Sequence, residues 1–239
     1  MAILRLWSLS GALRGASGDR GWDENGPVDA RLGQRDLEAL RWVGEQYACR
    51  LDQLQVLLGR LGGREPLSAS AARSVVSRWE TLGMAARGSF IAGEPSWVWL
   101  TRQGLRQAGL AFRVVQPKPW TLPHTAAVNR VRLFVEPRRP GARWRPEREL
   151  RAAGAGAGHG EGVPDAEIHD AGGNVIAVEV ELSPKSPDRR RRAMQALVAR
   201  YDSVWYFASA DCWVALHDAV CHVPPQLADV VRIYALEDL

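Results

Sequence analysis

Three carboxylates and a lysine in one short segment are the residues of this chain best suited to chemistry. The segment VPDAEIHDAGGNVIAVEVELSPKS, residues 163–186, holds two runs of alternating apolar and polar residues around a Gly-Gly pair. This pattern predicts a β-hairpin. The first run contains Asp165, the second contains Glu179 and Glu181, and Lys185 follows shortly after. Whether these side chains do chemistry depends on whether the hairpin brings them together.

The pairing of the two strands decides which carboxylates are neighbours. The apolar residues of the second strand share one face, and Glu179 and Glu181 share the other. Cross-strand partners lie on the same face of a sheet, so a two-residue turn is excluded because it would place Asp165 opposite Val180. A three-residue loop, 171–173, places Asp165 opposite Glu179, whereas a five-residue loop places it opposite Glu181. In both cases the paired Cβ atoms lie roughly 5 Å apart.

Carboxylates at this spacing have two interpretations. Like charges opposite one another repel unless a cation or solvent screens them. Converging carboxylate oxygens suit Mg²⁺, with Mn²⁺ as a substitute, and such an ion binds and polarises substrate phosphates. In this interpretation Asp165, Glu179 and Glu181 are metal ligands. The other interpretation is a solvated hairpin face, where the repulsion costs little.

A run of four arginines follows the hairpin. The residues Ser186 and Pro187 predict the start of a helix, with Ser as the cap and Pro at the first position. The helix macrodipole disfavours cations in a first turn. We therefore expect the run, together with Lys185, to contact phosphate, although a solvated helix end is the alternative. The run consists of Arg189, Arg190, Arg191 and Arg192.

The N-terminal half has the order of elements of a winged helix-turn-helix. Helical patterns cover 33–47, 50–61 and 68–82, and the third begins with a serine cap. Two short strands within 85–101 and a further helix at 101–110 come next. This order predicts a recognition helix at 68–82 and a wing formed by the hairpin. A small helical domain that binds protein is the alternative.

The predicted recognition helix exposes short polar and cationic side chains, the types that reach phosphates and base edges. We expect DNA contacts from Arg73, Ser74, Ser77 and Arg78 on the helix and from Arg87 at the hairpin tip, in the wing.

The C-terminal half predicts a mixed sheet covered by helices. After a helix at 124–136, a strand in 142–151 is expected to break or bulge at Pro146, and 151–162 to form a mobile loop. The hairpin, the helix from Pro187, and strands at 203–209 and 231–236 follow, with a less regular helix near 211–219. His124 falls on the apolar stripe of its helix, which indicates a hydrogen-bonded core histidine.

The predicted fold class is α+β, divided into four segments. A mobile N-terminal tail covers 1–30, the winged helix 31–112, a proline-containing linker 113–123, and the mixed-sheet α/β domain 124–239. The linker is inferred from three spaced prolines.

Composition points to a folded cytoplasmic protein. The chain has 239 residues, 46% hydrophobic and 24% charged, with a net charge of +4. Any nucleic-acid footprint must therefore come from local clustering of charge. Three scattered cysteines argue against a disulfide framework. The N-terminus resembles a signal peptide only weakly, because Arg5 interrupts its apolar start, and no apolar segment is long enough to span a membrane.

The hairpin resembles the restriction-endonuclease-like (PD-(D/E)xK) superfamily. The motif PD, followed by E-x-E on the next strand within an α-β-β-β-α-β order, carries the resemblance. It implies that Asp165 and Glu179 bind a metal ion. Glu181 stands where the superfamily has a lysine, a departure that some members share. Lys185 can supply the missing cation only if the end of the strand curls back.

A longer resemblance covers residues 31 to about 217. The succession LGQRDLEALRWV, WLTRQGLRQAG, LPHTAAVNRV, WRPEREL, VPDAEI and VEVELSP is similar to the replication-relaxation family of bacterial plasmids and integrative elements. His124 and Asn129 correspond to the HxxxVN motif of that family. The resemblance implies a role in plasmid replication or mobilisation.

Together these observations predict a DNA-binding protein of a mobile genetic element that nicks DNA with Mg²⁺, using Asp165, Glu179, Glu181 and Lys185. The expected partner is double-stranded DNA, with a homodimer or a partner protein of the same element as further expectations and no membrane. Two alternatives are open. One is a non-catalytic regulator with a degenerate nuclease fold, and the other is a nuclease subunit for transposition or defence that needs a partner.

Overall fold

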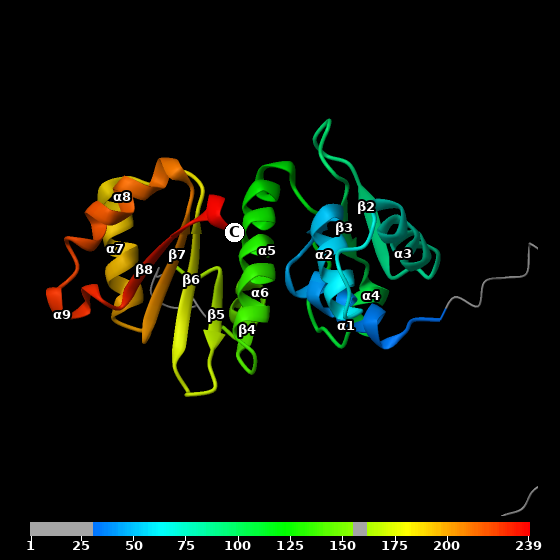
Figure 1. Cartoon of the computed structure of the whole chain (residues 1–239), viewed down its shortest axis with the longest axis horizontal. Helices are drawn as coiled ribbons and strands as arrows, with labels where there is room; N and C mark the ends of the chain where they lie inside the picture. Colours follow the sequence, from blue (N-terminus) through cyan, green and yellow to red (C-terminus); the bar gives the residue numbers. More distant parts are fainter. Residues whose placement is uncertain (1–30, 155–161) are drawn as a thin grey trace, which may run out of the picture. The chain divides into compact units, whose positions relative to one another are not determined.

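The computed structural model describes residues 31–154 and 162–239. Residues 31–239 form one compact unit of mixed α+β structure, which in its described part contains two β-sheets (Figure 1). The predicted tail at 1–30 and most of the predicted loop at 151–162 lie outside the described residues. None of the helices in the described part is both long and apolar enough to cross a bilayer.

The N-terminal half contains every element predicted for it and one more. A two-residue strand, which is too short to leave a sequence pattern, pairs with the last strand and completes a three-stranded sheet of order β1-β3-β2. The elements are α1 (Gln34–Glu45), β1 (Cys49–Arg50), α2 (Leu51–Leu61), α3 (Ala69–Thr81), β2 (Ala85–Gly88), β3 (Trp97–Leu100) and α4 (Arg102–Gln107).

Burial of one face of each helix holds this half together. Leu40 of α1, Leu54 of α2 and Trp79 of α3 are fully buried in one hydrophobic cluster. Ser68 caps α3, because its hydroxyl accepts a hydrogen bond from the Ala71 backbone N–H at 3.2 Å. The face of α3 opposite Trp79 is exposed to solvent.

The segment predicted as a linker ends in a helix. Pro119 opens a 3-10 turn, η1 (Pro119–Thr121), and α5 (Leu122–Val135) begins directly after it. Pro123 therefore lies in the first helical turn, where a proline is tolerated because its missing N–H would have no intrahelical partner. The helix predicted from 124 thus starts at Leu122, inside the predicted linker.

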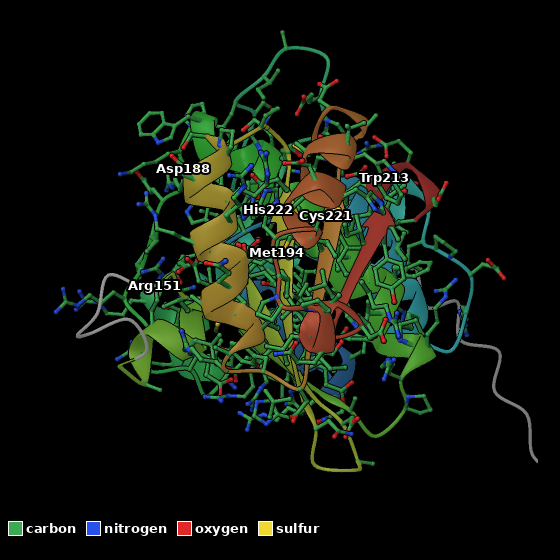
Figure 2. All side chains as sticks on the ribbon, turned by 90° about the vertical axis from the view of Figure 1, so that its left-hand side faces the viewer. Arg151, Asp188, Met194, Trp213, Cys221 and His222 are labelled. Atoms are coloured by element: carbon green, nitrogen blue, oxygen red, sulfur yellow. The ribbon has the colours of Figure 1, made fainter. Side chains whose placement is uncertain are left out.

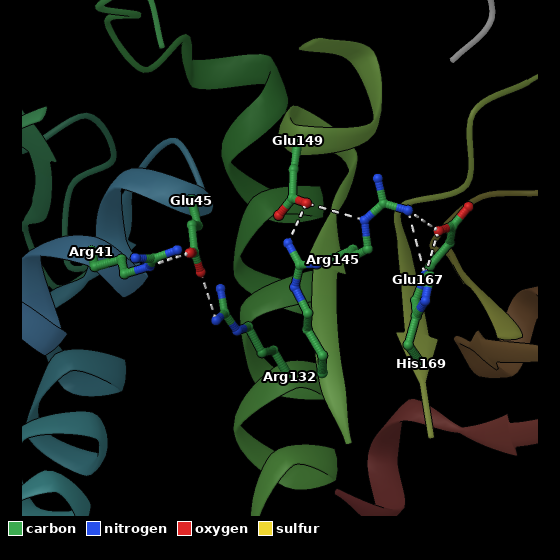
Figure 3. A network of polar contacts seen from close by, with 8 residues as sticks. Arg41, Glu45, Arg132, Arg145, Glu149, Glu167 and His169 are labelled. Carbon is green, nitrogen blue, oxygen red and sulfur yellow. Dashed lines mark hydrogen bonds and ion pairs between the residues drawn. The ribbon is translucent and has the colours of Figure 1, made fainter. Parts of the chain in front are cut away.

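Helix α5 packs against both halves of the unit. Its residue Leu133 belongs to the N-terminal cluster, whereas Val128 and Val131 pack on the sheet of the C-terminal half. Arg132 is buried and donates to Glu45 of α1 at 2.8 Å, a contact seen at close range in Figure 3. Asn129, which is fully buried, donates to the Ala48 carbonyl at 2.9 Å. The two halves are therefore joined by polar contacts as well as by the connecting chain.

The C-terminal half is a five-stranded mixed sheet of order β4-β5-β6-β7-β8. The first three strands are antiparallel and the last three are parallel. Helix α5 covers one face, and α7 and α8 cover the other (Figures 1 and 2). The elements are β4 (Arg143–Pro146), α6 (Glu147–Ala152), β5 (Ala166–His169), β6 (Val175–Glu181), α7 (Pro187–Val198), β7 (Ser203–Ala208), α8 (Ala210–Val220), α9 (Pro225–Ala228) and β8 (Val231–Ala235), with short 3-10 turns η2 (Glu136–Arg138) and η3 (Leu236–Asp238).

The segment around Pro146, which was predicted to be one strand, forms a strand and then a helix. Pro146 is the last residue of β4 and pairs with Ala166 of β5. Since proline lacks the N–H that a longer ladder would need, the chain leaves the sheet and forms α6 from Glu147.

Candidate functional site

The hairpin β5–β6 has the register of a three-residue loop. Ala166 pairs with Val178, and the turn closes where the Asp170 backbone N–H donates to the Asn174 carbonyl at 3.0 Å. Gly173 adopts a φ of 85°, which glycine tolerates best. Continuing the register places Asp165, the residue before β5, opposite Glu179. The three-residue alternative is therefore confirmed and the five-residue alternative is wrong.

Both carboxylate oxygens of Asp165 have a partner. Oδ1 accepts a hydrogen bond from His124 Nε2 at 2.8 Å, and Oδ2 accepts one from the Val180 backbone N–H at 2.8 Å. The second bond satisfies a donor of β6 just beyond the end of β5. Asp165 thus stands at the edge of the hairpin, held between the first turn of α5 and β6.

His124 is a member of this site and not a core residue, so its assignment to the buried stripe was wrong. Its side chain is 46% exposed and forms the ion pair with Asp165. On this stripe Val128, Val131 and Val135 are buried, whereas the His124 side chain turns to the Asp165 carboxylate. Partial burial lowers the pKa of His124, but the hydrogen bond to Asp165 and its negative charge outweigh this and hold the pKa above its ordinary value.

The end of β6 curls back, which is the condition under which Lys185 can serve the site. Lys185 Nζ donates to Glu181 Oε2 at 2.6 Å. Glu181 is only 3% exposed, and its other oxygen, Oε1, is buried without a hydrogen-bond partner. Burial lowers the pKa of Lys185, but the hydrogen bond to Glu181 and that residue's charge raise it above the ordinary value, so the ammonium group stays charged.

Glu179 carries the most perturbed carboxylate of the site. Burial, and next the negative charge of Asp165, raise the pKa of Glu179 well above its ordinary value, although Lys185 opposes the shift. Glu181 and Glu147 raise the pKa of Glu179 further. Glu147 begins α6, and its backbone N–H donates to the Asp165 carbonyl at 2.9 Å. The acidic cluster, defined here as Glu147, Asp165, Glu179 and Glu181, is therefore a set of carboxylates that interact electrostatically.

The carboxylate oxygens of the acidic cluster are the type of ligand that Mg²⁺ prefers, but the carboxylates are not arranged around a common point as metal ligands would be. Carboxylate oxygens are suitable ligands, and Glu181 Oε1 is a buried anionic oxygen without a partner. Among residues 31–154 and 162–239, however, no group of three or more His, Cys, Asp or Glu side chains is arranged to hold a metal ion. Asp165 Oδ1 is paired with His124 and Glu181 Oε2 with Lys185, so a bound ion would compete with these two contacts.

The residues predicted to contact DNA differ in how accessible they are. Arg73, Ser74 and Ser77 are exposed on the face of α3 that is turned away from the core. Arg78 is partly buried and donates to Asp36 of α1 at 2.6 Å. Arg87 lies within β2, at the base of the hairpin loop and not at its tip, and pairs with Glu80 at 3.3 Å. Arg78 and Arg87 therefore have structural partners that DNA would have to replace.

The four arginines of α7 also differ in their exposure and in their partners. Arg189 and Arg192 are exposed. Arg191 lies 3.7 Å from Asp218 of α8. Arg190 is buried, with 7% exposure, and donates to the Lys185 carbonyl at 2.9 Å. It fixes the curled segment that carries Lys185, so it is not placed to meet phosphate as predicted.

Sequence reasoning missed two residues of the site, His124 and Glu147. His124 matched the period of the buried residues, and this signal was misleading because its partner Asp165 comes from a distant part of the chain. Glu147 could have been found from Pro146, since a proline that ends a strand brings the next side chain to the edge of the sheet. Comparisons of the chain with protein-family models, with curated proteins and with solved structures find no match. Its function is therefore proposed from its own residues, their geometry and the resemblance of its motifs.

Proposed function

We propose that the protein binds double-stranded DNA through its N-terminal half, acting as a winged helix-turn-helix. The observation that carries this proposal is the order α1-β1-α2-α3-β2-β3-α4 combined with the exposed face of α3. In that arrangement α3 would enter the major groove and the loop between β2 and β3 would lie along the backbone. Arg73 is the cation of the α3 face for which no ion pair is found in the described part of the chain.

A binding titration tests this proposal. Fluorescence anisotropy of labelled duplex DNA, at two salt concentrations, is measured for the wild type and for Arg73→Ala. Loss of the guanidinium should weaken binding by about 1–3 kcal/mol if it reads a base, or lower the salt slope by about one if it meets a phosphate. Arg106→Ala on α4, also an exposed arginine on a helix of this half, is the matched control. Equal affinity of all three proteins would contradict the assignment of α3.

We further propose that the C-terminal half has the core of a restriction-endonuclease-like domain and nicks the bound DNA with Mg²⁺. Its support is the gathering of Asp165, Glu179 and Glu181 with Lys185 around the end of β6, the middle strand of the five-stranded sheet. A bound Mg²⁺ would polarise the scissile phosphate. The residues of the chain would hold the ion through carboxylates, while Lys185, freed from Glu181, would offset negative charge on the phosphate.

Metal binding has a test that is separate from cleavage. Adding Mg²⁺ or Ca²⁺ to the wild type should raise its thermal midpoint, because a ligand that binds only the folded state stabilises it. Glu179→Gln, which keeps the size of the side chain, should reduce that rise. An unchanged midpoint in both proteins would favour the alternative of a non-catalytic regulator with an inert acidic face.

The resemblance to the replication-relaxation family supports placing this activity in the replication or mobilisation of a plasmid or integrative element in the cytoplasm. We also propose that the protein acts as a homodimer or together with a partner protein of the same element. Sedimentation of the protein with and without its DNA would measure both.

A further inference from the structure

A pocket lies directly beside the acidic cluster. Its volume is about 470 Å³, within the range of small-molecule sites. The walls come from the turn after α1, from the segment that leads into η1, and from the first turns of α5 and α6. His124 and Asp165, which form the ion pair of the candidate site, are among its lining residues. Whatever occupies this pocket is therefore next to the carboxylates.

Exposed apolar side chains are concentrated at the rim of this pocket. Trp120 lines it and is 75% exposed, an unusual state for so large an apolar ring. Val115, which also lines the pocket, and its neighbour Val114 are 41% and 44% exposed. Such a cluster of exposed apolar groups marks an interaction site more often than a single exposed residue does.

The pocket wall also contains a residue whose backbone is in a disfavoured conformation. Tyr47 has a φ of 66° and is, in the part of the chain that the structure describes, the one residue other than glycine with a positive φ. A bulky side chain in this region costs free energy that the surrounding structure must offset, and such residues cluster at functional sites. The Cζ atom of the Arg148 guanidinium lies 4.8 Å from the centroid of the Tyr47 ring. This contact fixes the orientation of an aromatic ring at the pocket.

A cation stands at the mouth of the pocket. Lys118 Nζ is 5.5 Å from the centroid of the Trp120 ring, and both residues line the pocket. Arg148 is buried, and its guanidinium is occupied by the carbonyl groups of Gly44 and Arg113. Lys118 is therefore the lining cation best placed to meet an anion that arrives from solvent.

From these features we infer that the pocket receives an unstacked nucleobase of a DNA strand, with Trp120 stacking on the base and Lys118 meeting the adjoining phosphate. This inference rests on the proposed function and deepens it. Aromatic rings and a nearby cation are the combination that binds single-stranded nucleic acid, because every base has a face for stacking and every nucleotide has a phosphate. Extrusion of one base would also draw its backbone towards Asp165.

The test compares single-stranded with fully paired DNA. A short oligonucleotide carrying the fluorescent adenine analogue 2-aminopurine is titrated with the wild type, Trp120→Ala and Trp213→Ala. Trp213, which is labelled in Figure 2, lies on α8, far along the chain from the pocket. The centroid of its ring lies 4.9 Å from that of His217. The same proteins are titrated with the matching duplex, and circular dichroism checks that each is folded.

The expected result is weaker binding of the single strand by Trp120→Ala, by about 5- to 150-fold, with Trp213→Ala unchanged. The quenching of 2-aminopurine by the wild type should be lost with Trp120→Ala. Equal single-strand binding by Trp120→Ala and the wild type, an equal loss in Trp213→Ala, or no single-strand binding at all would overturn the inference. Duplex binding that persists in any of these cases would leave the proposed function standing, whereas a wild type that binds neither DNA would remove both.

Discussion

At the scale of single residues, the carboxylates of the acidic cluster differ in how they are paired. Glu147 accepts from Arg151 at 2.8 Å, Asp165 from His124 and Glu181 from Lys185. Among residues 31–154 and 162–239, Glu179 has no such partner. An anion near other anions without a hydrogen bond is unfavourable unless it takes up a proton or a cation. Glu179 is therefore the member of the cluster on which a ligand ion would act most strongly.

This pairing predicts how stability depends on pH. The folded pKa of Glu179 is raised, mainly by burial and by Asp165, so the folded state resists ionisation. Below the unfolded pKa of about 4.3, Glu179 is protonated in both states and does not affect the free energy of unfolding. As the pH rises from there towards the folded pKa, the ionised unfolded state is favoured and the protein becomes less stable. Glu179→Gln should therefore raise the thermal midpoint at neutral pH, and the gain should disappear near pH 4. A gain that is the same at both pH values would contradict this origin.

His124 gives a second prediction, in metal-free protein. Its pKa is raised by Asp165 against the effect of burial, so the stability it contributes is full below its unfolded pKa of about 6.5 and is lost as the pH rises through the folded pKa. An NMR titration of the His124 ring should give a pKa above 6.5, and Asp165→Asn should bring it below the wild-type value.

The candidate site could be predicted from the sequence only in part. Asp165, Glu179 and Glu181 followed from alternation and burial, because the period of a strand fixes the face of each residue. The position of Lys185 depended on a curl that Arg190 stabilises from within α7, and no local pattern encodes that contact. His124 joins Asp165 from 41 residues away in the chain, a long-range contact that periodicity cannot show.

At the scale of elements, the hairpin loop 171–173 sets the register that places Asp165 opposite Glu179. Gly173 has a φ of 85°, and no atom lies within 4 Å of where a Cβ would stand, so a side chain would fit and only the backbone conformation opposes it. Gly173→Ala should destabilise the protein by about 1–2 kcal/mol in urea unfolding. Gly173→Asn should lose less, because asparagine tolerates this region. Equal losses in the two variants would point to a cause other than the backbone.

The elements that sequence patterns predicted are those long enough to carry a period. Helices α1, α2, α3, α5 and α7 all appear near their expected ranges. The two-residue β1 and the four-residue α9 were missed because neither completes a repeat. Helix α6 was missed because its six residues were read as a continuation of the strand before Pro146.

At the scale of the whole described unit, Arg132 joins the half that holds α3 to the half that holds the acidic cluster. Its side chain is 7% exposed and donates to Glu45 at 2.8 Å and to Glu136 at 2.7 Å. Arg132→Met would leave the Glu45 carboxylate largely buried, with Arg41 as its remaining ion-pair partner in the described part of the chain. We expect a loss of about 3–5 kcal/mol in the free energy of unfolding.

Urea unfolding of Arg132→Met, followed by circular dichroism and by tryptophan fluorescence, measures this loss. The two probes should give coincident transitions in the wild type, because the halves share α5. Arg143→Met is the control. Because the Arg143 side chain is 63% exposed in its ion pair with Glu149, this substitution should cost less than about 1 kcal/mol. Separate transitions of the two probes in the wild type would show that the halves unfold independently.

We propose that the N-terminal half delivers DNA to the acidic cluster, and nicking of supercoiled plasmid tests this most directly. Wild type, Asp165→Ala and Arg73→Ala are incubated with the plasmid in Mg²⁺, Mn²⁺ or EDTA. We predict nicking by the wild type that requires the metal ion, is abolished in Asp165→Ala and is reduced in Arg73→Ala. Equal nicking by all three proteins, or no nicking by a wild type that binds the same DNA, would contradict the claim.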